Sequence, residues 1–372
     1  IVLTALVNAL ILIPFILLAT PAGVLSDRLP KPEIMRQAAN ITVVITLLIT
    51  LCYYQGWFEL AFFLTLLLAI QSAFFSPAKY GYIRERIGVD GLASANGIVQ
   101  AVTIIAILFG MFFFSFLFET MLATESPQRG SEYLQTVAPL GWLLVVLAIL
   151  ERVVAGRLQP GEYVGEQRDG VGGVPQELHS VVQTIGAIRQ TPMVWYSVLG
   201  LSLFWGISQV AIAAFPALAK EALGVTNTLV IQGVLALAGV GILIGSLIVA
   251  RISRGYIETG LIPIGAIGVT VALISVPEAA SLEFLALLFL LLGLCGGLLI
   301  VPLNALIQFH AEPSRLGQIL AGNNWMQNIV MLLFLGITMS VALLDLESQI
   351  NPSGLFWMIA LVALLVTVVA IV

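Results

Sequence analysis

The stretch Gly23-Val24-Leu25-Ser26-Asp27-Arg28-Leu29-Pro30-Lys31 separates two long apolar runs of the chain. The first run occupies residues 1–22, and the second begins at Ile34. A helix needs about 20 apolar residues to cross the hydrocarbon core of a bilayer. The stretch is therefore predicted to be a short charged loop that joins two membrane-spanning helices.

The composition excludes a soluble domain. Of the 372 residues, 60% are hydrophobic and only 9% are charged, and the mean hydropathy is +1.07. A soluble surface needs roughly a quarter charged residues. Cys52 and Cys295 both lie inside apolar segments, and His179 and His310 lie far apart in polar loops. Neither a disulfide framework nor a metal site is indicated, and no cofactor is expected.

Apolar runs of spanning length recur along the whole chain. They predict eleven helices, at residues 1–22, 34–55, 58–76, 97–118, 134–154, 193–218, 226–250, 257–276, 283–305, 318–343 and 353–372. The only long polar connection, 156–192, is rich in glycine and charge, so we interpret it as a linker with a short amphipathic helix near residues 177–190. The prediction is an all-α polytopic membrane protein with bundles at 1–155 and 193–372.

Basic residues alternate between the predicted connections and indicate the orientation. Most lie in connections on one side of the membrane, whereas Arg129 and Lys220 lie on the other. Lysine and arginine are retained on the cytoplasmic side of membrane proteins. The linker and the C-terminus are therefore predicted to be cytoplasmic, and residue 1 is predicted to start outside.

The two halves repeat at a shift of roughly 222 to 227 positions. Gly23 before one basic loop corresponds to Gly245 before another, and Asn96 corresponds to Asn323. A parallel duplication of one helix bundle explains the pattern. The helix at 193–218 then lacks a counterpart, so we expect a twelfth helix to precede Ile1 in the parent protein.

The loop at 23–31 resembles the signature Gly-x-Leu-x-Asp-Arg-x-Gly-Arg-Lys of the major facilitator superfamily, with Pro30 in place of the second glycine. Four further strings resemble the bacterial lysophospholipid transporter family. They are Ser76-Pro77-Ala78-Lys79-Tyr80-Gly81, Ala95-Asn96-Gly97, Ser202-Leu203-Phe204-Trp205-Gly206 and Val301-Pro302-Leu303-Asn304-Ala305-Leu306-Ile307-Gln308. The resemblance implies the major facilitator fold, with two pseudo-repeated six-helix bundles.

The resemblance also implies a function. It indicates a carrier that brings lysophospholipids, chiefly lysophosphatidylethanolamine, from the outer to the inner leaflet of the bacterial inner membrane. The implied partners are the bilayer and a fused or associated acyltransferase with acyl-carrier-protein synthetase activity; no nucleic acid is expected. The helix after Ser202 carries no arginine between Gln209 and Phe215, which puts a cationic contact to the phosphate from that helix in doubt.

Polar side chains inside membrane spans are costly and normally face a cavity or a partner helix. Asn96, Gln100 and Thr103 share one helical face by their spacing. The predicted substrate-binding residues are Asn8, Gln71, Lys79, Asn96, Gln100, Ser202, Trp205, Gln209, Asn304, Asn324, Gln327 and Asn328. The alternative is that these amides only hold helices together through interhelical hydrogen bonds.

The charged loop and Lys79 have specific hypotheses. An acid at a helix end can pair with the positive N-terminal end of a neighbouring helix only when that side is closed. By resemblance, Gly23, Asp27, Arg28 and Lys31 form a conformational latch of the outward-facing state. The amine of Lys79 could meet the substrate phosphate, or it could extend to the interface and anchor its helix.

Other functions are open on the sequence alone. A proton-driven exporter of drugs or small solutes from the same superfamily is the first alternative. The membrane portion of an acyltransferase is the second, although the chain shows no His-x4-Asp pair, no Ser/His/Asp set and no phosphate-binding glycine loop. We therefore predict a carrier without enzymatic activity.

Overall fold

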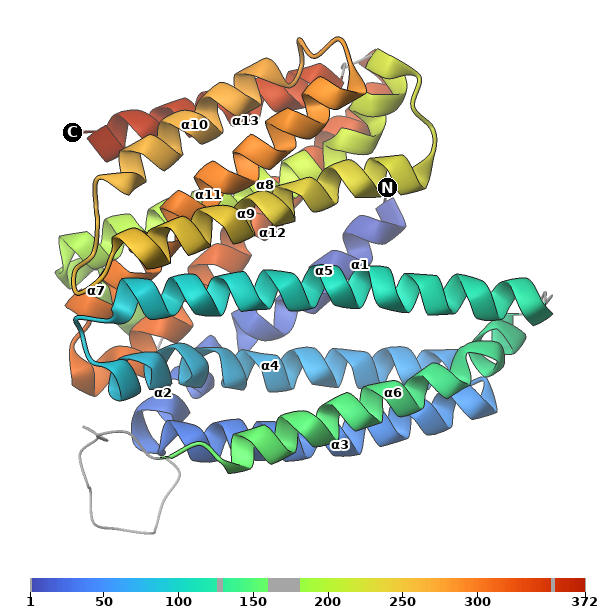
Figure 1. The fold of residues 1–372 in the computed structure, drawn as a ribbon, viewed down its shortest axis with the longest axis horizontal. Coiled ribbons are helices and arrows are strands. Elements are labelled where there is room, and N and C mark those ends of the chain that lie inside the picture. Colours follow the sequence, from blue (N-terminus) through green and yellow to red (C-terminus); the bar gives the residue numbers. More distant parts are fainter. Residues whose placement is uncertain (1, 126–129, 160–180, 349–351, 372) are drawn as a thin grey trace.

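The computed structural model describes residues 2–125, 130–159, 181–348 and 352–371. Within these ranges the chain is helical apart from its short connections (Figure 1). In chain order the elements are α1 (Val2–Leu17), α2 (Ala19–Arg28), α3 (Lys31–Gln55), α4 (Phe58–Ile87), α5 (Leu92–Glu125), α6 (Gly130–Gly156), α7 (Val181–Gln190), α8 (Pro192–Leu223), α9 (Thr228–Ile252), α10 (Leu261–Ser275), α11 (Leu282–His310), the 3-10 turn η1 (Pro313–Arg315), α12 (Leu316–Ser348) and α13 (Pro352–Ile371).

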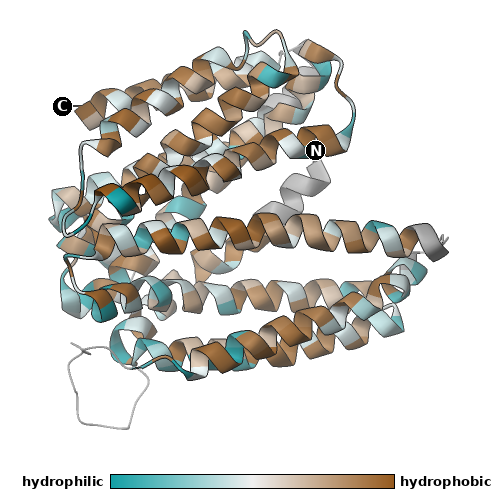
Figure 2. Cartoon of the chain, in the orientation of Figure 1, coloured by the Kyte–Doolittle hydropathy of each residue, from teal (hydrophilic) through white to brown (hydrophobic). Residues whose placement is uncertain are grey.

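The prediction of an all-α membrane protein is confirmed. In the described part of the chain, eight helices are long and apolar enough to cross a membrane, and the bent pair α1–α2 makes a ninth. Each predicted span coincides with a helix, although α10 is only 15 residues long. Figure 2 shows apolar residues along the helix bodies and hydrophilic residues gathered at the helix ends.

The first predicted span is not one straight helix. α1 and α2 meet at Leu18 with a bend of 52°. Pro21 has no N–H to donate to the carbonyl of Leu17, and its ring would clash with that carbonyl in a continuous helix. The chain therefore restarts at Ala19, where Pro21 lies in the first helical turn and is tolerated. Pro216 and Pro302, by contrast, lie inside continuous helices.

The fourth element is longer than predicted. The span predicted at 58–76 continues to Ile87, so Lys79, Arg84 and Arg86 belong to a helix and not to a loop. Pro77 removes only one backbone donor and does not end the helix. The end comes at Gly88, whose φ of 76° turns the chain while its N–H donates to the carbonyl of Arg84. α5 likewise begins before, and ends after, its predicted limits of 97 and 118.

The helices pack in two groups on either side of α7. In the first half, α3 packs against α4 and α6, and α5 packs against α4 and α6. In the second half, α8 packs against α11, α12 and α13, while α11 packs against α9 and α10. We call the end of the molecule where α2 and α11 finish and α5 and α12 begin the linker end; it lies at the left of Figure 1.

Glycines bring α9 and α11 into backbone contact within the second half. A Cβ built at Gly241 or Gly245 would collide with the α11 backbone, and one at Gly293 or Gly297 would collide with the α9 backbone. Small residues at a four-residue spacing allow such an approach between membrane helices. These four glycines are therefore packing contacts between the two helices.

The amphipathic helix predicted in the linker is present as α7. It occupies Val181–Gln190, while residues 177–180 of the predicted range lie outside the described residues. Thr184, Ala187 and Ile188 are buried, whereas Val182 is exposed. α7 packs against α2, α8 and α12, so this part of the linker is an element of the linker end.

Candidate functional site

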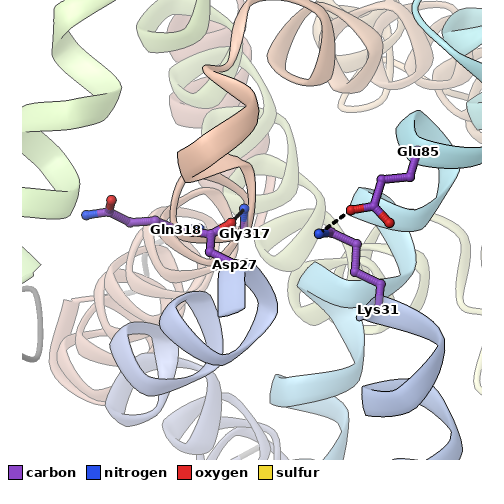
Figure 3. Close-up of polar contacts among 5 residues, drawn as sticks. All are labelled: Asp27, Lys31, Glu85, Gly317 and Gln318. Atoms are coloured by element: carbon purple, nitrogen blue, oxygen red, sulfur yellow. Dashed lines mark hydrogen bonds and ion pairs between the residues drawn. The ribbon is translucent and has the colours of Figure 1, made fainter. Parts of the chain in front are cut away.

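Asp27 lies in the last turn of α2 and reaches the first turn of α12 in the other half of the chain. Its Oδ1 accepts a hydrogen bond from the backbone N–H of Gly317, and its Oδ2 accepts one from the N–H of Gln318 at 2.8 Å (Figure 3). The first four N–H groups of a helix have no partner within the helix, and the helix dipole makes this end positive. The carboxylate therefore caps α12 both by hydrogen bonding and by charge.

Two glycines allow α2 and α12 to meet at this point. A Cβ on Gly23 would lie 2.9 Å from the Cα of Gln318. A Cβ on Gly317 would lie 2.7 Å from the Cβ of Ser26 and 2.7 Å from Oδ1 of Asp27. Real side chains essentially never come so close, so any larger residue would push the two helices apart.

Lys31 forms an ion pair within the first half of the chain. Figure 3 shows its side chain directed at Glu85 of α4, with which it forms an ion pair. Both side chains are nearly buried, with exposures of 5% and 11%. Lys31 therefore ties α3 to α4 beside the α2–α12 contact. Arg28 is exposed, and it also takes part in an interaction.

Asn96 and Gln308 form a reciprocal amide pair across the two halves. Nδ2 of Asn96 donates to Oε1 of Gln308 at 3.0 Å, and Nε2 of Gln308 donates to Oδ1 of Asn96 at 2.9 Å. Both residues are buried, with exposures of 3% and 0%. Buried amides need such partners because an unpaired one costs about 1–3 kcal/mol. The pair joins α5 of the first half to α11 of the second.

A second polar contact joins the halves, and here the amide belongs to the second half of the chain. Nδ2 of Asn324 on α12 donates to Oγ of Ser76 on α4 at 2.9 Å. The internal repeat relates α4 to α11 and α5 to α12, so this contact is the counterpart of the Asn96–Gln308 pair. Each of the two amide-bearing helices, α5 and α12, thus meets a polar residue on another helix of the opposite half.

The α2–α12 contact has a counterpart of the same kind in α5 and α9. A Cβ on Gly97 would lie 2.6 Å from the carbonyl oxygen of Ser246, and Oγ of Ser94 donates to the carbonyl of Ala250 at 3.0 Å. In both contacts a buried serine hydroxyl, that of Ser26 or of Ser246, has no hydrogen-bond partner among the described residues. Duplication has thus placed two similar glycine-and-serine contacts on the two sides of the molecule.

The α5–α9 contact runs along the half of each helix near the linker end. Its farthest glycine, Gly239, touches Leu108. Beyond this point the side chains of Phe109, Phe112 and Phe116 are at least half exposed. The two helices also diverge in Figure 1 away from the linker end. The halves are therefore held together at the linker end.

Several predicted site residues lie in other surroundings. Ser202 is fully buried and donates to the carbonyl of Val198 in its own helix, so it does not line an accessible site in this state. Asn304 donates to Ile300 O and Asn328 to Asn324 O, again within one helix. Gln71 accepts from Ser72 Oγ at 3.3 Å. The side chain of Asn8 lies outside the described part of the chain.

The remaining predicted residues are partly buried. They are Gln100 on α5, Trp205 and Gln209 on α8, and Gln327 on α12. Gln327 donates to Oδ1 of Asn323 at 2.8 Å, and the Trp205 ring meets Phe204 edge-on. Gln100 and Gln327 are thus neither fully buried nor fully exposed, and their role in binding stays a prediction.

Lys79 is partly buried on α4, one turn from Ser76. Its Nζ lies 4.6 Å from the centroid of the Tyr80 ring. Within the described part of the chain, no acidic side chain forms an ion pair with it. A cation on the helix face next to a contact between the halves can meet an anion that enters between them.

The comparison with protein families agrees with this architecture. The model of the Major Facilitator Superfamily matches residues 2–335. The chain belongs to this superfamily. The repeat-related contacts between its halves and the resemblance of the 23–31 loop to the superfamily signature are consistent with that membership.

Sequence similarity to named transporters also identifies the family to which the chain belongs within this superfamily. The lysophospholipid transporter LplT of Photorhabdus laumondii is 30% identical over 327 residues, which cover 87% of this chain and 75% of the relative. The LplT of Yersinia pestis is 29% identical over 326 residues, with coverages of 87% and 74%. The chain therefore belongs to the lysophospholipid transporter family.

Solved structures show the same fold. The human organic anion transporter MFSD10 aligns with a TM-score of 0.76 at 13% identity, over 99% of this chain and 83% of that chain. The major facilitator transporter FucP in the outward conformation aligns with a TM-score of 0.75 at 13% identity, over 99% and 89%. The expected major facilitator fold is confirmed.

Sequence reasoning missed several residues that join the halves. Gln308 was part of a quoted family string but was not selected, and Ser76 was in another. Arg84, whose Nη1 donates to the carbonyl of Ala311 at 2.6 Å, was interpreted only as a marker of orientation. Gly317 had one available signal, its place directly after a basic turn and before an apolar run.

Proposed function

We propose that this chain carries lysophospholipids, chiefly lysophosphatidylethanolamine, from the outer to the inner leaflet of the bacterial inner membrane by alternating access. The observation that carries the proposal is the capping of α12 by Asp27, a contact between halves that only a closed linker end can make. The two relatives named lysophospholipid transporters supply the substrate class.

In this proposal the two bundles, 1–155 and 193–372, rock about the contacts that join them. The linker end and the C-terminus are cytoplasmic, in line with the excess of basic residues there. The closed linker end then corresponds to a carrier open toward the outer leaflet. An acyltransferase on the cytoplasmic side, fused or associated, would consume the lysophospholipid that is delivered.

The head group is proposed to meet the polar faces of α4, α5, α8 and α12. Amides such as Gln100 and Gln327 can donate to phosphate and glycerol oxygens, while the Lys79 ammonium supplies a positive charge. The acyl chain needs only apolar surface, which the phenylalanines of α5 provide. Gly23, Asp27, Arg28 and Lys31 are proposed to act together as the latch, with Lys31 acting through Glu85.

Uptake of labelled lysophosphatidylethanolamine into vesicles with and without the protein tests the proposal. Lys79→Ala should lower uptake roughly tenfold, because a hydrogen bond to a charged group contributes about 1.5–3 kcal/mol. Arg86→Ala is the matched control, since Arg86 is an exposed cation on the same helix and should leave uptake unchanged.

Three outcomes would count against parts of the proposal. Equal uptake with and without the protein would refute the substrate class. Uptake of a drug-like cation driven by a proton gradient, with no lysophospholipid uptake, would favour the exporter alternative. Full activity of Lys79→Ala would remove this residue from the binding site.

A further inference from the structure

The connection between α11 and α12 exposes two helix ends of opposite polarity within a few residues. α11 ends at His310, and α12 begins at Leu316 after the short turn η1. The last carbonyls of α11 form the negative end of its dipole, and the first N–H groups of α12 form the positive end of the next. The connection at 311–315 therefore presents a negative and a positive group side by side toward the first half.

The first half meets these two ends with side chains of the matching sign. Asp27 of α2 accepts from the N–H groups of Gly317 and Gln318 at the positive end. Arg84 of α4 donates through Nη1 to the carbonyl of Ala311 at the negative end, over 2.6 Å. The carbonyl belongs to the residue that caps α11, and Ala311 itself is buried. An acid and a base from one half thus hold the two ends of a single turn of the other half.

We propose that Asp27 and Arg84 act as one two-point clamp on the α11–α12 turn, which holds the linker end closed and is released as a unit when that end opens. The proposal rests on the proposed alternation between two states, and it assigns to Arg84 a role equal to that of the acid. Because the charges oppose each other in sign, the clamp also fixes the register of the turn. A rotation that exchanged the two helix ends would bring like charges together.

A cation at a helix C-terminus can also be a feature of the fold alone, and this chain contains such a case. Arg36 of α3 donates to the carbonyls of Ala155 at 3.3 Å and Leu158 at 2.6 Å, both at the end of α6. Arg36 and Ala155 belong to the first half, and Leu158 follows directly after α6. Arg36 therefore separates the two explanations, since its contact is kept in both states whereas that of Arg84 must break.

The test measures the distance between two spin labels by pulsed electron paramagnetic resonance, in nanodiscs and without lysophospholipid. Cysteines replace Ile87 at the end of α4 and Arg254 after α9, both of them exposed. The buried Cys52 and Cys295 are replaced by alanine. In this background we expect the short-distance, closed population to dominate. Asp27→Asn and Arg84→Gln should each lower the ratio of closed to open molecules by about fivefold.

The sign of the charge provides the sharpest control. Arg84→Lys should keep most of the closed population, whereas Arg84→Glu should deplete it more than Arg84→Gln. Arg36→Gln should lower thermal stability without moving the label distance, and Arg86→Gln should change neither. An Arg84→Gln distance distribution equal to that of Arg86→Gln, with Asp27→Asn shifted, would overturn the paired clamp.

The experiment is independent of the substrate. A protein that opens and closes as expected but does not take up lysophosphatidylethanolamine would retain the clamp and lose the proposed function. A protein that takes up the lipid while Arg84→Glu stays closed would retain the function and lose the clamp.

Discussion

The contact between α9 and α11 and the contact between α2 and α12 both depend on glycine, yet their chemistry differs. Gly241, Gly245, Gly293 and Gly297 bring α9 and α11 backbone to backbone with no charged group between them. The α2–α12 contact combines Gly23 and Gly317 with a carboxylate bound to two N–H groups. On separation, water can hydrate the carboxylate and the N–H groups, whereas the glycine helices would exchange close backbone packing for looser contacts with lipid tails. We infer that the first contact is permanent and the second reversible.

The largest expected effect tests the permanent contact. Gly293→Ala places a methyl group against the carbonyl of Ala238. The intrinsic helix preference of alanine, about 1 kcal/mol over glycine, cannot offset such overpacking against backbone. We expect loss of folded protein, measured as the yield of the monodisperse species after purification.

Gly233→Ala on α9 is the control for this change, because a Cβ there meets nothing within 4 Å. It should purify as well as the parent protein. Normal yield and thermal stability of Gly293→Ala would show that α9 and α11 can move apart, and would remove the distinction between the two contacts.

An intermediate effect tests the reversible contact. Gly317→Ala introduces a Cβ 2.7 Å from that of Ser26, but only while the linker end is closed. The open state gains the helix preference of alanine and suffers no clash. We expect normal folding, a population shifted to the open state by at least about tenfold, and slow lysophospholipid uptake.

Label distances and vesicle uptake measure this shift. Gly336→Ala lies on the same helix with nothing within 4 Å of its Cβ, and it should leave both unchanged. If Gly317→Ala failed to fold, as Gly293→Ala should, the α2–α12 contact would be as permanent as the α9–α11 contact.

The smallest expected effect concerns α7. Nε2 of Gln318 donates to Oγ1 of Thr184 at 3.2 Å, and both side chains are buried. Thr184→Val leaves the amide without this acceptor, which costs about 1 kcal/mol in the closed state. The ratio of closed to open molecules should fall about fivefold. Thr46→Val should not change it, because this hydroxyl donates to carbonyls of its own helix α3. An equal shift in both variants would exclude α7 from the latch.

Much of this architecture could be predicted from the sequence because membrane spans are encoded locally. Apolar length alone located the helices, and the four-residue spacing of the glycines in α9 and α11 is the sequence signal of their close contact. The break at Leu18 was missed because a count of apolar residues takes no account of backbone hydrogen bonds, and Pro21 has no N–H to donate to the carbonyl of Leu17. The continuation of α4 to Ile87 was missed because charged residues ended the apolar count, although a helix can extend beyond the bilayer.

For the contacts between the halves, the sequence indicated the type of interaction but not the partner residues. The charge and position of Asp27 indicated a helix N-terminus as its partner, but the identity of α12 depends on how the two halves dock. Asn96 was selected for its polarity, whereas Gln308 is its partner through a separation of 212 residues. Ser202 was selected by the same criterion and is bonded within its own helix. Polarity alone does not separate such cases.

The hydroxyls of Ser26 and Ser246 have a consequence for energetics. Each is buried and has no hydrogen-bond partner among the described residues, at one of the two glycine contacts between the halves. An unsatisfied buried hydroxyl destabilises the closed state by roughly 1–3 kcal/mol, and this free energy is recovered when the contact opens and water hydrates the hydroxyl. These two unsatisfied hydroxyls therefore destabilise the closed state and partly offset the favourable hydrogen bonds beside them. The free-energy difference between the closed and open states is thereby reduced, so that the modest binding energy of a single lipid can shift the equilibrium.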